Sequence, residues 1–376
     1  MLTITGAVLE EVGRPRPFST SRPLTVSELT LDPPGPDEIL VRIEAAGICH
    51  SDLSVADGNR VRPTPMLLGH EAAGIVEGLG DNVDDLHIGD RVVLTFLPLC
   101  GECDGCRSHG RLPCERGAEA NGAGALMGGG RRLRRNGTPV HHHLGVSGFS
   151  THAVVHRSSA VRVAPDVPAE VAALLGCAVL TGGGAVINAG RPEPGETVMV
   201  VGLGGVGLAA VLVALAERHP VIAVDALESK LAVARELGAQ QVLTPAQLAE
   251  SGQRAPVVIE AAGHPRAFET AFAATAPGGT TVTVGLPAPS ARSEISPLAV
   301  TTEARRIVGS YLGSSVPARD IPRYADLWRN GNLPVERLIS GRVGFDDLNA
   351  AMDALADGRA LRQILVPSPS TRRDPA

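Results

Sequence analysis

The sequence predicts an α/β protein with two domains, a strand-rich first domain and a second domain built on a doubly wound parallel sheet. Its 376 residues exceed the usual length of a single core. Short β-like runs interrupted by Gly and Pro fill residues 1–163, whereas apolar strand and helix runs alternate from residue 179 onward. We therefore expect domains over 1–178 and 179–308, and a tail over 309–376 that is too short for a third core and returns to the first domain.

The composition is that of a soluble globular protein, with 44% hydrophobic and 20% charged residues. A net charge of −6 offers no basic surface for nucleic acid. The N-terminus lacks a basic cap, an apolar core and a small-residue cleavage site, and no apolar stretch looks long enough to span a bilayer. We therefore expect a cytoplasmic protein without nucleic-acid or membrane partners, in which the six cysteines favour metal binding over disulfides.

The first metal signature is Cys49-His50-Ser51-Asp52, followed later by Gly69-His70-Glu71. A lone cysteine or histidine is more often a buried core residue than a ligand, so this signature depends on a third donor. Cys177 is the candidate. Two thiolates and one imidazole with an open fourth position are the ligand set of a catalytic zinc site.

The second metal signature is a set of four closely spaced cysteines, Cys100, Cys103, Cys106 and Cys114. Four thiolates complete a tetrahedral zinc shell, so the lobe over about 96–116 is predicted to hold a structural zinc ion. An iron–sulfur cluster and a nucleic-acid-binding zinc ribbon are the alternatives. Ribbons usually pair two CxxC knuckles across a longer gap, and no basic or aromatic face accompanies this lobe.

A loop-like segment rich in arginine and histidine follows, with Arg131, Arg132, Arg134 and Arg135 before His141, His142 and His143. Three adjacent histidines invite a metal hypothesis, and the arginines could attract an anionic substrate. Charge runs are more often solvated faces, so we interpret this segment as a solvated surface loop.

The second domain opens with a glycine-rich turn, Gly202-Leu-Gly204-Gly205-Val206-Gly207, between an apolar strand and an apolar helix. In a dinucleotide-binding unit Gly202 allows the tight turn, Gly204 lets the backbone approach a pyrophosphate, and Gly207 lets helix and strand pack closely. Asp225 ends the next strand, where a carboxylate hydrogen-bonds the adenosine ribose and repels a 2′-phosphate. This pattern favours NAD over NADP. The alternative interpretation is that the glycines form a simple strand-to-helix turn and that Asp225 is an ordinary acidic residue at the end of a strand.

The tail contains two predicted helices, over 321–328 and 345–355, and a closing strand over 362–366. Its last residues, 367–376, are rich in Ser, Pro and Arg and are expected to fray.

Together these residues resemble the zinc-dependent alcohol dehydrogenases of the medium-chain dehydrogenase/reductase superfamily. The likeness covers nearly the whole chain and rests on the Cys49–Asp52 stretch, Gly69–Glu71, the four-cysteine lobe, Gly176-Cys177, Gly202–Gly207, Asp225 and Leu361-Arg362. It implies a GroES-like catalytic domain, a Rossmann domain, NAD, and two zinc ions per chain, one catalytic and one structural. The loop between Cys114 and Cys177 is similar to that of the long-loop branch of liver-type and class III enzymes, which implies a homodimer.

The resemblance also implies roles in catalysis. Cys49, His70 and Cys177 would bind the catalytic zinc, and Glu71 would lie close behind it as an additional or exchanging carboxylate. Asp52 would hydrogen-bond the far nitrogen of His70, and Ser51 would accept the proton of the substrate hydroxyl. Phe96 would form a wall of the substrate pocket.

Further positions would contact the cofactor in addition to the glycine-rich turn and Asp225. His50, Lys230 and Arg362 would meet its pyrophosphate and ribose, and Val284 and Leu286 would meet the nicotinamide.

The expected function is that of a zinc-dependent NAD oxidoreductase that interconverts primary or aromatic alcohols and aldehydes by hydride transfer from a zinc-bound alkoxide. The chain has Ser54 where liver-type enzymes place a histidine that passes the proton to solvent, so we expect His50 or ordered water to replace it. Only one acid occurs in Asp57-Gly58-Asn59-Arg60, which disfavours S-hydroxymethylglutathione as a substrate. With Arg60 and Arg62 nearby, the alternatives are an S-hydroxymethyl adduct of another thiol, an anionic alcohol and, remotely, a non-catalytic NAD- or zinc-binding protein.

Overall fold

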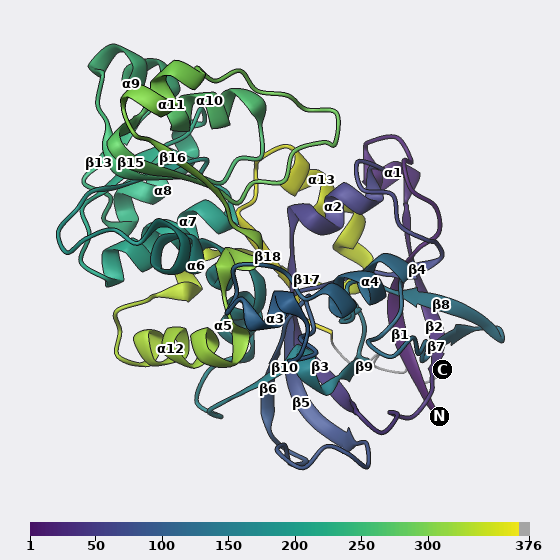
Figure 1. Cartoon of the computed structure of the whole chain (residues 1–376). Coiled ribbons are helices and arrows are strands. Elements are labelled where there is room, and N and C mark those ends of the chain that lie inside the picture. The colour runs from purple at the N-terminus through teal and green to yellow at the C-terminus, as the bar shows by residue number, and fades with distance from the viewer. Residues whose placement is uncertain (368–376) are drawn as a thin grey trace. The chain divides into compact units, whose positions relative to one another are not determined.

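The structure is a computed structural model that describes residues 1–367 (Figure 1). We expected residues 367–376 to fray, and all of them except Pro367 lie outside the described residues. The chain folds into two compact units. Unit 1 comprises Met1–Cys106, Cys114–Gly176 and the segment from Ile339 onward, and unit 2 comprises Arg107–Pro113 and Cys177–Leu338.

Unit 1 is rich in strands, which form a closed barrel and a mixed sheet. The barrel follows the order β1-β2-β7-β8-β4, with β1 at Leu2–Leu9, β2 at Leu24–Leu31, β4 at Met66–Leu67, β7 at Leu133–Arg135 and β8 at Thr138–His142. The mixed sheet follows the order β10-β6-β5-β3-β18-β17, and β9 also pairs with β3. Its strands are β3 (Glu38–Ile48), β5 (Ala72–Leu79), β6 (Arg91–Leu94), β9 (His152–His156), β10 (Ala160–Val163), β17 (Ile339–Val343) and β18 (Arg362–Leu365).

Strand β3 is central to this sheet and leads directly into the candidate site. Its alternating apolar residues Ile39, Val41 and Ile43 are buried in the main core of unit 1. Strand β18 pairs antiparallel with the end of β3, with Ile364 opposite Gly47. The returning tail therefore completes the sheet at the point where β3 ends.

The helices of unit 1 are short. They are α1 (Phe18–Ser21), α2 (His50–Ala56), α4 (Glu115–Ala123), α5 (Ala169–Leu174) and α13 (Leu348–Ala356), with 3₁₀ turns at Arg157–Ser159 and Phe345–Asp347. Helix α3 (Asp104–Arg107) lies where the chain leaves unit 1 in the cysteine lobe.

Unit 2 contains the parallel sheet that the strand–helix alternation predicts, in the order β13-β12-β11-β14-β15-β16. The strands are β11 (Val198–Val201), β12 (Val221–Val224), β13 (Gln241–Leu243), β14 (Ala255–Glu260), β15 (Thr275–Thr283) and β16 (Arg306–Gly309). The helices are α6 (Leu180–Gly184), α7 (Gly205–Ala216), α8 (Glu228–Leu237), α9 (Pro245–Ser251), α10 (Pro265–Ala273), α11 (Pro297–Thr302) and α12 (Pro317–Arg329), with 3₁₀ turns at Tyr311–Ser314 and Val335–Leu338.

The tail returns to unit 1 later than the sequence predicts. The predicted return begins at residue 309, whereas unit 1 resumes at Ile339. Helix α12 belongs to unit 2 because it buries Ile321 and Tyr324 there. A Cβ on Gly183 of α6 would lie 2.6 Å from the Tyr324 hydroxyl, so Tyr324 packs closely against α6. An apolar stripe in the sequence shows that a helix is buried but does not show which core it joins.

One helical stretch is longer and more apolar than the sequence suggests. The π-helical segment Leu175–Val179 joins α5 to α6, and a second π-helical segment, Ala185–Gly190, follows α6, so that the run is continuous from Ala169 to Gly190. This run has 22 residues and a mean hydropathy of 1.8, so the expectation that no apolar stretch is long enough to span a bilayer was wrong by length and composition. Its apolar window is 89% buried within the protein, which is usual for a core helix.

We predict that Gly207→Ala lowers the free energy of unfolding by about 1–3 kcal/mol, because overpacking forces the backbone to move. A Cβ on Gly207 would lie 1.8 Å from the carbonyl oxygen of Gly202. The matched control is Gly204→Ala, since a Cβ there meets no atom within 4 Å and the backbone φ is −74°. This control should change stability by less than about 0.5 kcal/mol. Urea denaturation followed by circular dichroism measures both, and equal stability of the two variants would contradict the packing argument.

Candidate functional site

The candidate site begins where β3 meets α2, with a cysteine that caps a helix. Cys49 directly follows β3 and is the N-cap residue of α2. The Asp52 carboxylate accepts a hydrogen bond from the Cys49 backbone N–H at 3.1 Å. Such a carboxylate satisfies a backbone donor that has no partner within the helix. The Cys-x-x-Asp spacing therefore fixes the direction in which the Cys49 thiol leaves the backbone.

The same carboxylate orients His70. Asp52 Oδ1 accepts from the Gly69 backbone N–H at 3.2 Å and lies 3.0 Å from His70 Nδ1, and both side chains are buried. When Nδ1 donates to Asp52, the Nε2 lone pair of His70 stays available to a metal ion. Burial alone would raise the pKa of Asp52, but the charge of His70 and contacts from His70 and His143 lower it to about 2.

Two glycines make room for this arrangement. Gly69 has a φ of +91°, and a Cβ there would lie 2.4 Å from the backbone nitrogen of Phe149. A Cβ on Gly47 would lie 1.8 Å from Glu71 Oε1, so only glycine leaves space for this carboxylate. Glu71 is fully buried, and its Oε1 lies 3.9 Å from Nη1 of the buried Arg362.

Four buried donors converge here, namely Cys49, His70, Glu71 and Cys177. One ligand atom from each lies within 4.8 Å of the others. Cys177 is the first residue of the long segment of unit 2, and it directly follows Gly176, the last residue of a segment of unit 1. Gly176 itself packs tightly on β6, because a Cβ there would lie 2.3 Å from the Leu94 carbonyl. Two thiols and an imidazole with a nearby carboxylate fit a zinc ion that keeps an open position.

The four cysteines of the lobe also converge and belong entirely to unit 1. Their sulfur atoms pair at 3.9 Å, Cys100 with Cys106 and Cys103 with Cys114. A tetrahedron with zinc–sulfur bonds of about 2.3 Å has edges of about 3.8 Å, so the spacing fits a structural zinc ion. Backbone N–H groups of Cys106 and Glu115 point at the Cys103 sulfur and lower the pKa of that thiol to about 6.

The cysteine lobe is connected to Phe96, the predicted wall of the substrate pocket, through Asn121, which the sequence analysis did not identify. The Cys114 sulfur caps α4 by accepting from the Gly117 backbone N–H. Near the other end of α4, the buried Asn121 side chain donates to the Phe96 carbonyl at 2.7 Å. The Phe96 ring then meets the His70 ring edge-on, with centroids 5.7 Å apart. No sequence motif marks Asn121, because its role depends on where α4 ends.

The histidine segment is not the solvated loop that we predicted. His142 and His143 are both 1% exposed, and burial lowers the pKa of His142 to about 3. The period-two alternation of β8, in which Val140 is buried, places His142 on the same inward side. His143 Nδ1 lies 3.2 Å from Asp52 Oδ1, and its ring meets the His70 ring with centroids 5.5 Å apart. The alternation of β8 is the sequence signal that could have predicted burial.

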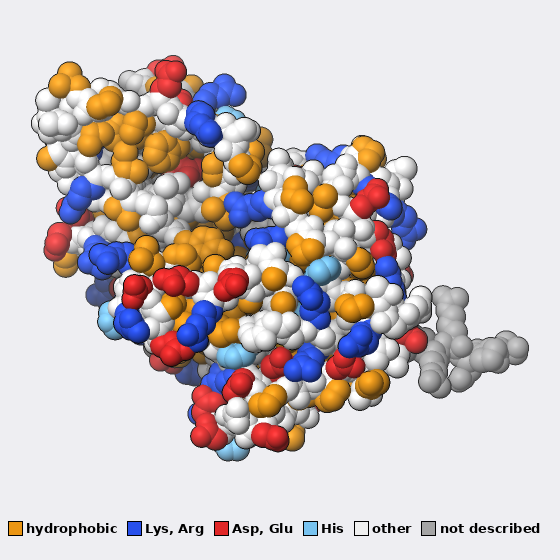
Figure 2. Space-filling model, turned by 45° about the vertical axis from the view of Figure 1, so that its right-hand side comes forward, with side chains coloured by type: hydrophobic (Ala, Val, Ile, Leu, Met, Phe, Trp, Pro, Cys, Tyr) orange, Lys and Arg blue, Asp and Glu red, His pale blue; other side chains and the backbone are white. Residues whose placement is uncertain are grey.

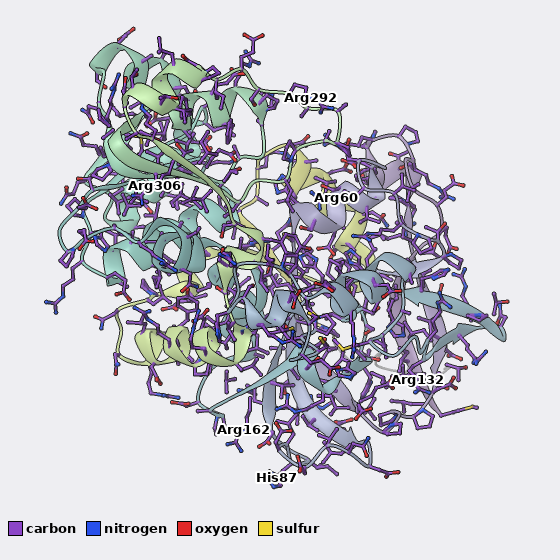
Figure 3. The ribbon with its side chains drawn as sticks, viewed as in Figure 1. Arg60, His87, Arg132, Arg162, Arg292 and Arg306 are labelled. Carbon is purple, nitrogen blue, oxygen red and sulfur yellow. The ribbon has the colours of Figure 1, made fainter. Side chains whose placement is uncertain are left out.

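The arginines before this segment are also more ordered than predicted. Arg134 and Arg135 end the strand β7, and side chains of the segment pair with acids rather than forming an anion site. The pairs are Arg132 with Glu38 at 2.7 Å, Arg134 with Asp32 at 3.1 Å and Arg135 with Glu10 at 2.6 Å. Arg132 is labelled in Figure 3, and Figure 2 shows acidic and basic side chains interspersed on the displayed face.

The glycine-rich turn in unit 2 has the shape that its spacing predicts. Gly202 directly follows β11 and has a φ of +93°, and a Cβ there would lie 2.6 Å from the backbone nitrogen of Ala262. Gly204 caps α7, which starts with Gly205 and Val206, and its own Cβ position is open. The free amides at this helix start suit a phosphate group.

Asp225 connects this turn to the end of β12. Its Oδ2 accepts from the Leu203 backbone N–H at 2.7 Å, and its Oδ1 accepts from the Leu227 backbone N–H at 3.0 Å. The Lys230 amine lies 3.9 Å from Oδ2. The acid is therefore held beside the glycine-rich turn, where a ribose hydroxyl would need an acceptor.

Val284 and Leu286, the predicted nicotinamide contacts, follow β15 in unit 2. The Val284 backbone N–H donates to the Glu260 carbonyl at 2.9 Å, whereas the Leu286 side chain is 48% exposed.

The remaining predicted residues lie around α2 and β18 in unit 1. Ser51 Oγ is 3.9 Å from Cys49 Sγ. His50 is exposed, and the Ser54 hydroxyl donates to its carbonyl at 2.7 Å. Arg362 donates from Nη1 to the last carbonyl of β3 at 3.4 Å. Arg60, labelled in Figure 3, lies in the loop after α2.

Known protein families and known structures are similar to this chain. The family described as alcohol dehydrogenase GroES-like domain matches residues 35–166, and the zinc-binding dehydrogenase family matches residues 205–329. The chain belongs to the zinc-binding alcohol dehydrogenases of the medium-chain dehydrogenase/reductase superfamily. Unit 1 thus contains the GroES-like domain and unit 2 the Rossmann-like domain of this family.

Individual relatives support the same family assignment. This alcohol dehydrogenase is 38% identical to geraniol dehydrogenase from Castellaniella defragrans, over 97% of this chain and 98% of that protein. An alcohol dehydrogenase zinc-binding domain protein from Burkholderia ambifaria has a similar structure, with a TM-score of 0.90 and 32% identity over 98% of this chain and 100% of that one. Benzyl alcohol dehydrogenase from Acinetobacter calcoaceticus has a TM-score of 0.89 and 31% identity over the same shares.

We predict that Cys49→Ala and Cys106→Ala each remove one equivalent of zinc per chain, with different effects on stability. Cys106→Ala should lower the melting temperature by about 5–15 °C, because a structural zinc ion contributes to folding. Cys49→Ala should lower it by less than about 5 °C, because the substitution also removes one of the buried negative charges that the lost ion would balance. Elemental analysis of dialysed protein and thermal denaturation measure both effects. An unchanged zinc content in either variant would contradict the prediction for the corresponding cluster.

Proposed function

We propose that this alcohol dehydrogenase uses NAD to interconvert a primary allylic or aromatic alcohol and its aldehyde. The observation that supports it most is the buried convergence of Cys49, His70 and Cys177 with Glu71 beside them. Three such donors fit a catalytic zinc ion and leave one position for a substrate oxygen. Zinc, when bound, polarises that oxygen, and the nicotinamide accepts the hydride.

The protein's own residues prepare this chemistry. Asp52 fixes the tautomer of His70, so that Nε2 is directed away from the carboxylate and is available as a ligand. Ser51 lies beside Cys49 and is the hydroxyl that we assign to receive the substrate proton. The Ser54 hydroxyl already donates to the His50 carbonyl, so the exposed His50 imidazole or water passes the proton onward.

The preference for NAD is proposed from Asp225. Its carboxylate is fixed by two backbone N–H groups beside the glycine-rich turn. A carboxylate there accepts hydrogen bonds from a ribose diol and repels the 2′-phosphate of NADP. The two zinc ions that we propose per chain are supported by the two separate donor clusters.

The substrate proposal has support from the relatives named for geraniol and for benzyl alcohol. The thiol-adduct formaldehyde reaction is a second candidate, because Arg62 donates to the Asn121 carbonyl at 3.3 Å and lies near the segment that holds Phe96. An arginine there suits the carboxylate of a thiol cofactor. The long loop after the lobe supports placing this chain in the class III-like branch.

We predict NADH formation from benzyl alcohol and geraniol at rates at least about tenfold above those from ethanol or from formaldehyde with added thiols. The panel is measured with NAD and with NADP, by the absorbance of the reduced cofactor, and Cys49→Ala is the inactive control. Faster turnover of formaldehyde with a low-molecular-weight thiol would favour the second candidate. A preference for NADP would contradict the role given to Asp225.

We also propose a homodimer in the cytoplasm. The location is supported by the two cysteine-containing clusters, since thiols bind a metal ion only in the reduced form. Within unit 2, β16 is an edge strand that exposes Ile307, and the preceding helix α11 exposes Leu298. An exposed apolar edge is a template for pairing with a second copy.

Light scattering should give twice the chain mass of 38.8 kDa, and Ile307→Asp should shift it toward the monomer. A monomeric wild type would contradict the dimer proposal.

A further inference from the structure

The Asp52 carboxylate is contacted by a second buried imidazole besides His70. His143 Nδ1 lies 3.2 Å from Asp52 Oδ1, the same oxygen that lies 3.0 Å from His70 Nδ1. The contact is close but is not aligned as a full hydrogen bond, and neither ring nitrogen of His143 has such a bond within residues 1–367. All three side chains are at most 1% exposed. A buried polar ring in this position needs a hydrogen-bond partner, and the carboxylate is the nearest acceptor that these contacts provide.

The backbone of His143 is held firmly by the turn that follows β8. Its carbonyl accepts from the backbone N–H groups of Val146 and Ser147, and its own N–H donates to the Ser147 hydroxyl at 3.1 Å. Leu144 and Ser147 have φ angles of +51° and +55°, a conformation that costs free energy in residues other than glycine. The fold maintains a strained turn at the point where it directs this histidine inward.

The rings also pack together around His70. The His70 ring meets His143 at 5.5 Å and Phe96 at 5.7 Å between centroids, with interplanar angles of 80° and 77°. Asp52 accepts in addition from the backbone of Cys49. A group that restrains Asp52 therefore restrains the backbone of one candidate ligand and the ring of another.

We propose that His143 is a positioning residue of the catalytic metal site, donating to Asp52 and so holding His70 with Nε2 toward the metal. The His143 ring packs edge-on against the His70 ring, and its Nδ1 lies 3.2 Å from the carboxylate, within donor distance. The inference rests on the proposed zinc site at Cys49, His70 and Cys177. It assigns a function to the histidine segment, which does not itself supply a donor to that site.

Two substitutions separate the polar contact from ring packing. His143→Phe keeps an aromatic ring against His70 but has no nitrogen near Asp52. His143→Asn has no ring, but its side-chain amide nitrogen takes the place of Nδ1 and can donate to the carboxylate. His141→Asn is the matched control, since His141 belongs to the same segment and is absent from the donor cluster around Asp52.

The experiment measures release of the catalytic metal to a chelator, together with the visible spectrum of the cobalt-substituted protein. We expect His143→Phe to release this metal about tenfold faster and to shift the cobalt bands, because partners of metal-bound histidines change metal affinity by about 10–100-fold. His143→Asn should restore release to within about threefold of wild type, and His141→Asn should match wild type. Circular dichroism and the melting temperature verify that each variant is folded.

Each outcome decides between the interpretations. Wild-type release and an unchanged cobalt spectrum in folded His143→Phe would overturn the positioning role. Rapid release from His143→Asn but not from His143→Phe would assign the effect to ring packing and also overturn it. If the wild type itself holds no metal that Cys49→Ala removes, the proposed zinc site fails and the positioning role fails with it, and this result is distinct from the first two.

Discussion

The hydrogen bonds of one buried carboxylate organise the candidate site. Asp52 accepts from the backbone of Cys49 with one oxygen and from the backbone of Gly69 and the ring of His70 with the other. These partners come from two segments that are separated in the sequence. The carboxylate therefore holds both candidate ligands, Cys49 and His70, in place. Without it a buried cysteine and a buried histidine would be independent core residues, as their isolated occurrence in the sequence suggests.

The four-cysteine lobe contributes to the same geometry through α4. The Cys114 sulfur of this lobe caps α4, and the Asn121 side chain on the last turn of α4 donates to the Phe96 carbonyl. Phe96 packs edge-on against His70. The proposed structural zinc ion would therefore do more than close a loop, because the helix that starts at the lobe also holds the segment from which Phe96 contacts His70.

The parts of the site that a single segment builds could be predicted from the sequence, and the long-range contacts could not. The cysteine spacing in the lobe and the glycine-rich turn are local patterns whose chemistry depends on neighbouring residues. The contact between His143 and Asp52 joins distant segments and depends on a strained turn, so the same histidines looked like a polar loop. The membership of α12 in unit 2 was missed because amphipathicity does not identify the core that a helix joins.

The charges in the buried donor set explain why a cation belongs to the folded state. When Cys49, Cys177 and Glu71 are deprotonated they bring three negative charges, and Arg362, 3.9 Å from Glu71, supplies one positive charge. Burying two uncompensated charges costs several kcal/mol each, so the set is unfavourable without a further cation. A divalent ion balances the sum and uses the same donors as ligands. Metal binding and folding of this region are therefore coupled, and the glycine at position 47, which leaves space for the Glu71 carboxylate, is part of that coupling.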